Sequence, residues 1–319
     1  MSWSYVLPRR FGFPKLRRLV VGVRSGLGFM RISHFACIAA VCAASMAANA
    51  GERPAPGQMQ LAWFQARSIF HSGLRDTHTI ALTFDDGPNA RTGAVLDVLK
   101  ANNVKATFFI VGIMAKAHPE MLARVAAEGN LLANHSASHP ELTGRFDDDP
   151  STLINQLKEV HDQIAPLMKQ TDTFYFRAPY GYWRSAHAAI LNADPVLRNY
   201  VGPIYWDIGG NLSMRDGYVM SSADWACWKH KWSASVCAKG YLREIRRDNG
   251  GVVLMHCIHA QSADLVAAVV PPLVEEGYNF VRLDQVPEYK QYETPLIAPA
   301  VASAAPLRAG TFVASNRVK

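Results

Sequence analysis

The chain of 319 residues has little charge, and beyond its first fifty residues it has no excess of either sign. Charged residues make up 18% and apolar residues 49%, a balance typical of globular proteins. The net charge of +7 comes from residues 1–50, which hold seven of the 33 basic residues and no acidic one, leaving 26 basic against 26 acidic. The rest of the chain lacks the basic footprint of a polyanion-binding protein, so we expect no nucleic-acid partner.

The basic residues of 1–50 all precede a short apolar stretch over 32–48 that is rich in alanine. This stretch is short for a stable membrane span, and it ends in Ala48-Asn49-Ala50, a pattern typical of signal-peptide cleavage. We predict a leader over 1–50, cleavage before Gly51, and a mature protein that is periplasmic or secreted. Translation from Met30 would give a signal of ordinary length. An uncleaved leader would be the protein's one attachment to a membrane.

Cysteine is scarce: two of the five cysteines lie in the predicted leader, and Cys227, Cys237 and Cys257 remain. An odd number permits at most one internal disulfide and leaves one thiol. Export permits such a bond, and we predict that Cys227 pairs with Cys237 to close a short loop that carries two tryptophans. A bond to Cys257 is the alternative.

Residues 51–75 contain Gly, Pro and Gln followed by an apolar patch, which predicts a linker and a short packing segment. Farther on, short apolar runs alternate with segments of helical period. The predicted strands cover residues 79–84, 105–111, 130–134, 173–177, 201–206, 251–255 and 279–283. The predicted helices cover residues 90–102, 117–128, 150–169, 184–192, 236–248 and 262–276. Strands that alternate with helices pair in parallel, so we predict an α/β fold, a (β/α) barrel in a single domain over 76–290.

Two segments interrupt the alternation. Residues 207–235 are too long and irregular for a simple connection, and their three tryptophans argue against disorder. We therefore predict one long functional loop there. Residues 291–319 are dominated by Ala, Pro, Val and Ser without a clean period, and we predict a disordered tail.

The stretch IALTFDDGP over 80–88 ends a predicted strand on two adjacent carboxylates, Asp85 and Asp86. A desolvated charge at the end of a buried strand needs a partner. In a barrel of this type the chemistry lies on loops at the C-terminal ends of the strands, so a metal ion or a proton transfer would account for the pair. A solvated turn before Gly87 is the alternative.

Three further polar motifs follow predicted strands. His135 and His139 stand four residues apart in HSASH, which suits two ligands of one metal if the segment turns as a helix. Taken alone, they could be an ordinary surface pair. Arg177 begins RAPYG, and His256 ends LMH. Four polar elements that each leave a strand would converge on one face of the barrel.

The motifs TFDDGP, HSASH, RAPYG and LMH, in this order and at these separations, resemble those of the polysaccharide deacetylases of the NodB-homology type, carbohydrate esterase family 4. The resemblance covers about residues 76–285. It implies a distorted (β/α) barrel of about seven strands and an acetylated glycan as substrate. It also implies a divalent metal, for which we expect Zn²⁺, with Co²⁺, Ni²⁺ or Mn²⁺ as alternatives.

The resemblance assigns a role to each motif residue. Asp86, His135 and His139 correspond to the metal ligands, which leave coordination positions open as a catalytic zinc site requires. Asp85 corresponds to the general base that takes a proton from water, and Arg177 to the residue that holds and tunes it.

The remaining roles concern the oxyanion, the leaving group and the sugar. The backbone N–H of Tyr180 would stabilise the tetrahedral oxyanion, and His256 would protonate the departing amine. We place Pro179, Trp206 and Asp207 with Tyr180 among the substrate-binding residues, although an aromatic such as Trp206 can equally belong to the core.

The sequence departs from the family pattern near the acid histidine. Relatives supply an aspartate that tunes this histidine, and here Asp207 and Asp224 are both candidates for the partner of His256. Cys257 follows His256 where many relatives have an aspartate, which bears on how the histidine is tuned.

We therefore expect a metal-dependent hydrolase that removes acetyl groups from N-acetylated units of a chitin-like glycan, peptidoglycan or an exopolysaccharide. An O-acetyl polysaccharide esterase is the alternative within the enzymes. A carbohydrate-binding protein on an inactive scaffold is the alternative outside them.

Overall fold

The computed structural model describes residues 64–143, 149–168, 173–290 and 292. The predicted leader, residues 51–63 of the predicted linker and nearly all of the predicted tail lie outside these residues. Within the described part of the chain, no helix combines the length and the apolar character needed to cross a membrane.

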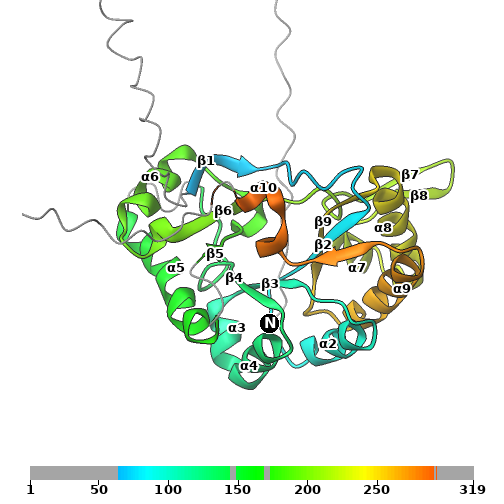
Figure 1. Ribbon diagram of the computed structural model, residues 1–319, viewed down its shortest axis with the longest axis horizontal. Coiled ribbons are helices and arrows are strands. Elements are labelled where there is room, and N and C mark those ends of the chain that lie inside the picture. The colour runs from blue at the N-terminus through cyan, green and yellow to red at the C-terminus, as the bar shows by residue number, and fades with distance from the viewer. Residues whose placement is uncertain (1–63, 144–148, 169–172, 291, 293–319) are drawn as a thin grey trace, which may run out of the picture. The chain divides into compact units, whose positions relative to one another are not determined.

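Strand β2 (Thr79–Asp85) lies at the centre of the fold (Figure 1). Its residues are mostly β-branched, aliphatic or aromatic, and all but the first are buried. β9 (Gly250–His256) runs parallel to it along its whole length. β10 (Asn279–Val281) pairs with the first half of β2, and β3 (Thr107–Ile110) pairs with the second half. Because every pair is parallel, these strands end on the same side.

The sheet continues from β3 to β4 (Leu131–Asn134) and reaches β5 (Phe174–Tyr175) through a single parallel bridge. β6 (Tyr200–Ile204) then pairs with β5. All seven predicted strands are present, with bounds close to those expected.

The barrel closes through the segment that follows β6. The main-chain N–H groups of Asp207 and Ile208 donate to the Val252 carbonyl of β9 at 2.9 and 3.1 Å. Ile208 also bridges Val253 in parallel. Since two of the contacts around the ring are isolated bridges, the barrel is distorted, which confirms the predicted fold class.

β1 (Phe64–Ile69) lies within residues 51–75, for which we predicted a linker and a short packing segment. It runs parallel to β6 on the edge away from β5. Phe64 is buried and stacks on Tyr200, with ring centroids 5.8 Å apart. The strand FQARSI has only two large apolar side chains, so its sequence gives a weak strand signal.

Helices surround the strands (Figure 1). They are α2 (Thr92–Ala101), α3 (Gly112–Ala117), α4 (Pro119–Ala127), α5 (Pro150–Ile164), α6 (Ser185–Ala193), α8 (Ala234–Asp248), α9 (Ser262–Glu275) and α10 (Pro287–Lys290), with 3₁₀ turns at Ala165–Leu167, Pro179–Gly181, Leu197–Asn199 and Leu283–Gln285. α4 confirms the helix predicted over 117–128, whereas α3 was not predicted. The two are separated at His118, which leaves helical geometry before Pro119. The other predicted helices are confirmed.

The predicted loop over 207–235 is more ordered than expected. It contains a hairpin of β7 (Ser213–Arg215) and β8 (Tyr218–Ser221) and the short helix α7 (Asp224–Lys229). β7 is fully exposed, so it has no apolar alternation that could have predicted it. The predicted disulfide between Cys227 and Cys237 is confirmed, and it joins α7 to α8.

The core has two layers that the pleat of β2 separates. Ile80, Leu82 and Phe84 belong to the cluster packed against the helices, and Ala81 belongs to the cluster inside the barrel. Successive side chains of a strand point to opposite faces. The pleat therefore directs Asp85, four residues after Ala81, towards the barrel interior at its carboxyl end.

Candidate active site

The four sequence motifs meet at the carboxyl ends of the barrel strands. Asp85 ends β2 and lies opposite His256, which ends β9. His135 directly follows β4, and Arg177 directly follows the bridge between β4 and β5. Parallel pairing brings all four residues to one end of the barrel, as the sequence predicted.

Asp86, His135 and His139 form the centre of this site. Asp86 Oδ1 lies 3.6 Å from His135 Nε2 and 3.3 Å from His139 Nε2. One possible ligand atom from each residue lies within 4.8 Å of the others. The structure thus brings together the three residues predicted as metal ligands, which we call the ligand trio.

The donor atoms of the trio fit a divalent metal. Asp86 Oδ1 is buried and has no hydrogen-bond donor among the described residues. His135 Nδ1 donates to the Arg177 carbonyl over 2.8 Å, so its Nε2 is the nitrogen left with a free lone pair. Burial, together with the nearby His139, lowers the pKa of His135 to about 3 and keeps its ring neutral. A neutral imidazole and an unpartnered carboxylate oxygen are donors that zinc accepts.

Left-handed backbone recurs around the trio. Asp86, Ser136, His139 and Tyr180 have φ angles of 71°, 68°, 54° and 58°. Such conformations cost non-glycine residues about 1–3 kcal/mol each and cluster at functional sites. The Ser136 N–H donates to Asn134 Oδ1 at 2.9 Å, and the Ser136 hydroxyl accepts the His139 N–H at 3.1 Å. HSASH is therefore a hydrogen-bonded loop, so the two histidines come together without the helical turn on which the sequence argument depended.

Asp85 is held by an arginine that is itself buried. Arg177 is 1% exposed and donates from Nη1 to Asp85 Oδ1 at 2.7 Å and to Thr83 Oγ1 at 2.9 Å. Its guanidinium lies 4.1 Å from the centroid of the Phe109 ring. Asp85 Oδ2 remains directed at the trio, 3.5 Å from His135 Nε2. A carboxylate fixed at one oxygen and facing the trio with the other is placed to accept a proton there.

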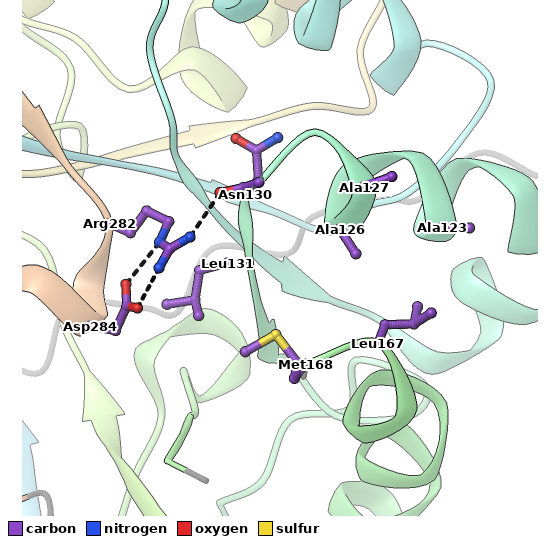
Figure 2. A pocket seen from close by; sticks show the side chains of 10 residues that line it. Ala123, Ala126, Ala127, Asn130, Leu131, Leu167, Met168, Arg282 and Asp284 are labelled. Atoms are coloured by element: carbon purple, nitrogen blue, oxygen red, sulfur yellow. Dashed lines mark hydrogen bonds and ion pairs between the residues drawn. The ribbon is translucent and has the colours of Figure 1, made fainter. Parts of the chain in front are cut away.

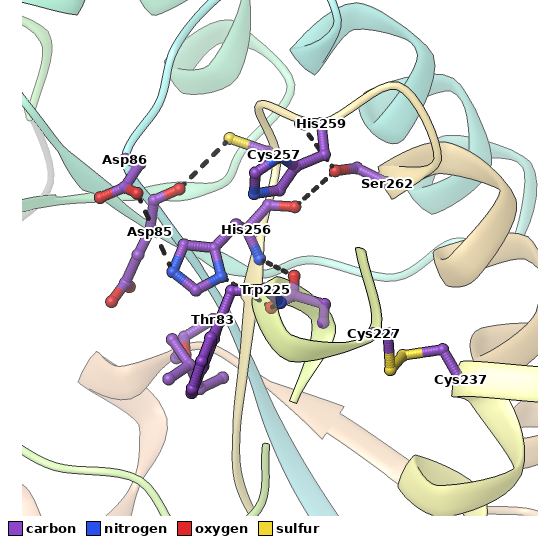
Figure 3. A network of polar contacts seen from close by, with 12 residues as sticks. Thr83, Asp85, Asp86, Trp225, Cys227, Cys237, His256, Cys257, His259 and Ser262 are labelled. Atoms are coloured by element: carbon purple, nitrogen blue, oxygen red, sulfur yellow. Dashed lines mark hydrogen bonds and ion pairs between the residues drawn. A yellow bond between two sulfur atoms is a disulfide. The ribbon is translucent and has the colours of Figure 1, made fainter. Parts of the chain in front are cut away.

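His256 is held by Asp224, which decides between the two predicted partners. Its Nδ1 lies 2.8 Å from Asp224 Oδ1. Its Nε2 points to Asp86 and lies 3.9 Å from Oδ2 of that residue (Figure 3). Burial lowers the pKa of His256, but the charge and hydrogen bond of Asp224, with Asp86 and Asp85, outweigh burial and raise it to about 10. The imidazole is therefore protonated at neutral pH.

Asp207 lies away from these side chains, which corrects its predicted place in the site. Its Oδ2 accepts the Ser72 hydroxyl and the Val252 N–H, each at 2.8 Å. Arg75 Nε lies 3.5 Å from Oδ1. Val252 precedes the end of β9 by four residues, so Asp207 fastens the closure of the barrel instead of facing a substrate.

Of the other predicted substrate-binding residues, Tyr180 lies beside the trio. Tyr180 is 43% exposed, and its ring meets that of His139 edge-on with centroids 4.5 Å apart. Pro179 is buried at the start of the same turn. Trp206 stacks on Tyr205 with centroids 4.0 Å apart. Half-buried aromatic faces thus continue from the ligand trio along the strand ends.

Gly181 explains how closely these aromatics pack. A Cβ added there would lie 3.1 Å from Tyr205 Cε2 and 3.3 Å from Trp206 Cη2, and its φ is +71°. Trp206 in turn lies over the Arg177 guanidinium, 5.5 Å from ring centroid to Cζ. The glycine of RAPYG therefore lets the turn approach the aromatic pair.

Sequence reasoning missed Tyr241, whose hydroxyl accepts the Asp224 N–H at 3.0 Å. A buried tyrosine on an amphipathic helix resembles any core residue, so no signal singled it out. Cys257 is a free, buried thiol, and burial raises its pKa to about 12. Its Sγ lies 3.5 Å from the Thr92 hydroxyl, directed away from the imidazole of the preceding histidine.

A separate cavity of about 330 Å³ lies at the other end of the barrel (Figure 2). Leu131, the first residue of β4, lines it together with Met168. Arg282 in its wall is paired with Asp284 and donates to the Gly129 carbonyl at 2.9 Å. This cavity therefore offers no free charge, and none of the residues assigned to chemistry lines it.

The fold and the site place an imidazole–carboxylate trio beside a carboxylate and an imidazole that are each held by a buried partner, an arrangement that suits a hydrolytic enzyme. Residues 73–196 match a family model described as polysaccharide deacetylase. The chain is 40% identical over 220 residues to the chitooligosaccharide deacetylase of Rhizobium leguminosarum bv. trifolii, covering 68% of this chain and 95% of that protein. The chain belongs to the polysaccharide deacetylase family.

Two further relatives agree with this assignment. The chain is 30% identical over 228 residues to a peptidoglycan-N-acetylglucosamine deacetylase of Bacillus cereus, covering 69% of this chain and 72% of that protein. It resembles the solved structure of peptidoglycan deacetylase PdaC from Bacillus subtilis, with a TM-score of 0.51 and 27% identity. That match covers 69% of this chain and 94% of that chain.

Proposed function

We propose that the protein is a metal-dependent N-deacetylase that releases acetate from N-acetylated units of a chitin-type oligosaccharide. The observation that carries the proposal is that Asp85 and His256 both face the ligand trio, each held by its own buried partner. One is arranged as a base and the other as an acid, and hydrolysis of an amide needs both. The similarity to a chitooligosaccharide deacetylase supports the choice of substrate.

Asp86, His135 and His139 would hold the metal, for which we propose Zn²⁺, with Co²⁺, Ni²⁺ and Mn²⁺ as alternatives. The bound ion would supply Lewis-acid polarisation of the acetyl carbonyl and of the attacking water. The protein's own contribution is to keep the His135 proton on Nδ1, where the Arg177 carbonyl accepts it.

Asp85 would take the proton of the attacking water at Oδ2, since Oδ1 is committed to Arg177. The buried guanidinium holds the carboxylate in place while that proton moves. The main-chain N–H of Tyr180, in the turn that follows Arg177, would donate to the oxyanion that develops on the acetyl carbonyl.

His256 would give its Nε2 proton to the sugar nitrogen as the carbon–nitrogen bond breaks, while Nδ1 stays bound to Asp224. Its raised pKa keeps this proton available at neutral pH. An amine has to be protonated to leave, whereas an activated ester depends less on such an acid. A held acid therefore meets the need of an N-acetyl group, and the similarity to a chitooligosaccharide deacetylase supports an N-deacetylase over an O-acetyl esterase.

We propose that the sugar lies against Tyr180 and Trp206, while the buried Pro179 begins the turn that carries Tyr180 instead of contacting the sugar as predicted. An exposed aromatic side chain beside a polar site can bind a sugar, because the apolar face of a sugar ring packs on the face of an aromatic ring. Phe70, which is 50% exposed, extends this surface because its ring lies 4.5 Å from that of Tyr205.

Acetate release from N-acetylated chitin oligomers, peptidoglycan fragments and acetylated xylan tests the proposal when it is combined with metal analysis. We expect release from the N-acetylated substrates and its loss on chelation. Release from acetylated xylan alone would establish an O-esterase. A metal-loaded protein that binds these glycans without releasing acetate would be a binding protein.

We also propose that the protein is exported and begins at Gly51, on the strength of the alanine-rich stretch and its cleavage pattern. N-terminal sequencing of protein from the periplasm or the medium tests this. Retention of residues 32–50 in a membrane fraction would show an anchor instead.

A further inference from the structure

Helix α7 carries the partner of the acid histidine but is too short to hold it. It has six residues, fewer than two turns, and Asp224 is the first of them. Isolated helices of this length have no stability of their own in water. The position of Asp224 therefore has to come from contacts between α7 and its neighbours.

Helix α8 supplies two of these contacts. Cys227 of α7 is disulfide-bonded to Cys237 of α8 (Figure 3). Tyr241 lies four residues after Cys237, on the same face of α8. Its hydroxyl accepts the Asp224 N–H at 3.0 Å. One helix face thus holds α7 covalently at its fourth residue and by a hydrogen bond at its first.

The same hydroxyl also fixes this assembly to the strand that carries the acid. Tyr241 donates to the Leu254 carbonyl of β9 at 3.0 Å, and Leu254 precedes His256 by two residues. The hydroxyl is buried, as are Asp224 and Cys237. The buried Tyr241 hydroxyl therefore fixes the position of the Asp224 main chain relative to the strand that carries His256.

We propose that the Cys227–Cys237 bond and Tyr241 form a clamp that positions Asp224 against His256 for proton donation to the sugar nitrogen. The inference rests on the proposed N-deacetylase function. Its residues touch no substrate and act only through Asp224. Displacing a catalytic group by about 1 Å can cost about 10²-fold in rate, so a loosened clamp should be visible in turnover.

A clamp that positions Asp224 and a contact that only stabilises the fold can be distinguished by the effect of their removal on kcat once Asp224 has also been replaced. If the bond and the hydroxyl act through the carboxylate, removing them should change nothing further once Asp224→Asn has been made. If they only stabilise the fold, their effects should add to that of Asp224→Asn.

The experiment measures kcat for acetate release from an N-acetylated chitin oligomer in two backgrounds, wild type and Asp224→Asn. The first test variant is Cys227→Ser with Cys237→Ser. The second is Tyr241→Phe, which keeps the disulfide and the ring and removes only the hydroxyl. Arg246→Gln is the matched control, since Arg246 lies on the same helix but pairs with Glu276 at the surface.

We expect each clamp variant to lower kcat by about 10- to 100-fold in the wild-type background, with metal content unchanged. We expect no further loss in the Asp224→Asn background, and no loss for Arg246→Gln beyond a lower unfolding temperature. Additive losses would overturn the clamp, as would an unchanged kcat. If the double cysteine variant does not fold, Tyr241→Phe decides by the same criteria.

A spectroscopic measurement separates the clamp from the chemistry. The proton between His256 Nδ1 and Asp224 should give a far-downfield ¹H resonance that Asp224→Asn removes. The clamp variants should broaden or abolish this signal, and the arginine control should keep it. A sharp, unshifted signal in Tyr241→Phe would overturn the inference. A wild-type protein that releases no acetate but shows these signal changes would refute the proposed function and leave the clamp intact.

Discussion

Asp224 binds His256 at two points: Oδ1 lies 2.8 Å from the ring Nδ1, and Oδ2 accepts the main-chain N–H at 2.6 Å. This fixes the ring plane and puts the shared proton on Nδ1, leaving Nε2 towards Asp86. His135 is held in the same way at Nδ1, but by the neutral Arg177 carbonyl. The charge of the partner therefore distinguishes the two histidines. The Asp224 carboxylate favours a protonated His256, as the proposed acid requires, whereas the Arg177 carbonyl leaves His135 neutral, as a metal ligand requires.

Asp224→Asn should lower the pKa of His256 and cut kcat on N-acetylated substrate by about 10²–10⁴-fold, the usual worth of a general acid. Since His256 has to be protonated to act as the proposed general acid, a lower pKa moves the alkaline limb of the kcat profile to lower pH. The pH dependence of kcat measures this. Asp207→Asn is the control, because Asp207 is buried but lies elsewhere. An alkaline limb that stays in place would contradict the assignment.

Asp85→Asn should abolish turnover while leaving the metal bound, because the amide keeps the shape of the carboxylate and loses its basicity. The expected loss in kcat is about 10²–10⁴-fold, with little change in substrate affinity. The unfolding temperature should also fall, since the buried charge of Arg177 loses its partner. Metal content and single-turnover rates check both points. Wild-type turnover, or loss of the metal, would show that the two adjacent aspartates do not divide the work in this way.

His135→Ala should remove metal and activity together, because it deletes the ligand whose lone pair is already directed at the trio. Ser138→Ala in the same loop is the control, since the Ser138 hydroxyl donates to Gln156 Oε1 at the surface, at 3.3 Å. A chelator should lower the unfolding temperature of the wild type and not of His135→Ala, because an ion bound only to the folded state stabilises it. Thermal unfolding with and without chelator measures this, and an equal response of both proteins would exclude the site.

The strand ends of this fold could be predicted because each carries its own signal. β2 and β9 are apolar runs that stop at Asp85 and His256. Because strands that alternate with helices pair in parallel, Asp85 and His256 can be placed together at the carboxyl end of the barrel from the sequence. β1 could not be found in this way, since its pairing with β6 stabilises a segment that is half polar.

The partner of His256 could not be chosen from the sequence for a similar reason. Asp207 follows a tryptophan and Asp224 precedes one, both in the same irregular segment. Nothing in the neighbouring sequence distinguishes the two aspartates. The choice depends on barrel closure, which binds Asp207 to the Val252 N–H, and on the packing of α7 against α8. Both are long-range contacts that no short window of sequence contains.

Glu244 should make the stability of the fold depend on pH with an unusual sign. It lies on α8 with its carboxylate buried, and Oε2 accepts the Ser222 N–H at 3.3 Å. Burial raises its pKa to about 7, against which the Ser222 N–H and Arg247 act only in part. Between its ordinary pKa of 4.5 and this value the folded state binds more protons than the unfolded state. Its contribution to stability is therefore fully present below about 4.5 and is lost as the pH rises through about 7.

Glu244→Gln should remove this dependence, because the amide stays neutral and can still accept the Ser222 N–H. Unfolding temperatures of variant and wild type, measured from pH 4 to pH 8, should therefore diverge in favour of the variant as the pH rises through about 7. Glu276→Gln provides a control of opposite sign, since the hydrogen bond from Arg246 lowers the pKa of Glu276. Relative to wild type, that variant should lose stability only as the pH rises towards 4.5, the ordinary pKa of a glutamate, and should change no further above it. A difference between Glu244→Gln and wild type that stays constant across this range would mean that Glu244 ionises in the folded protein as it does in the unfolded chain.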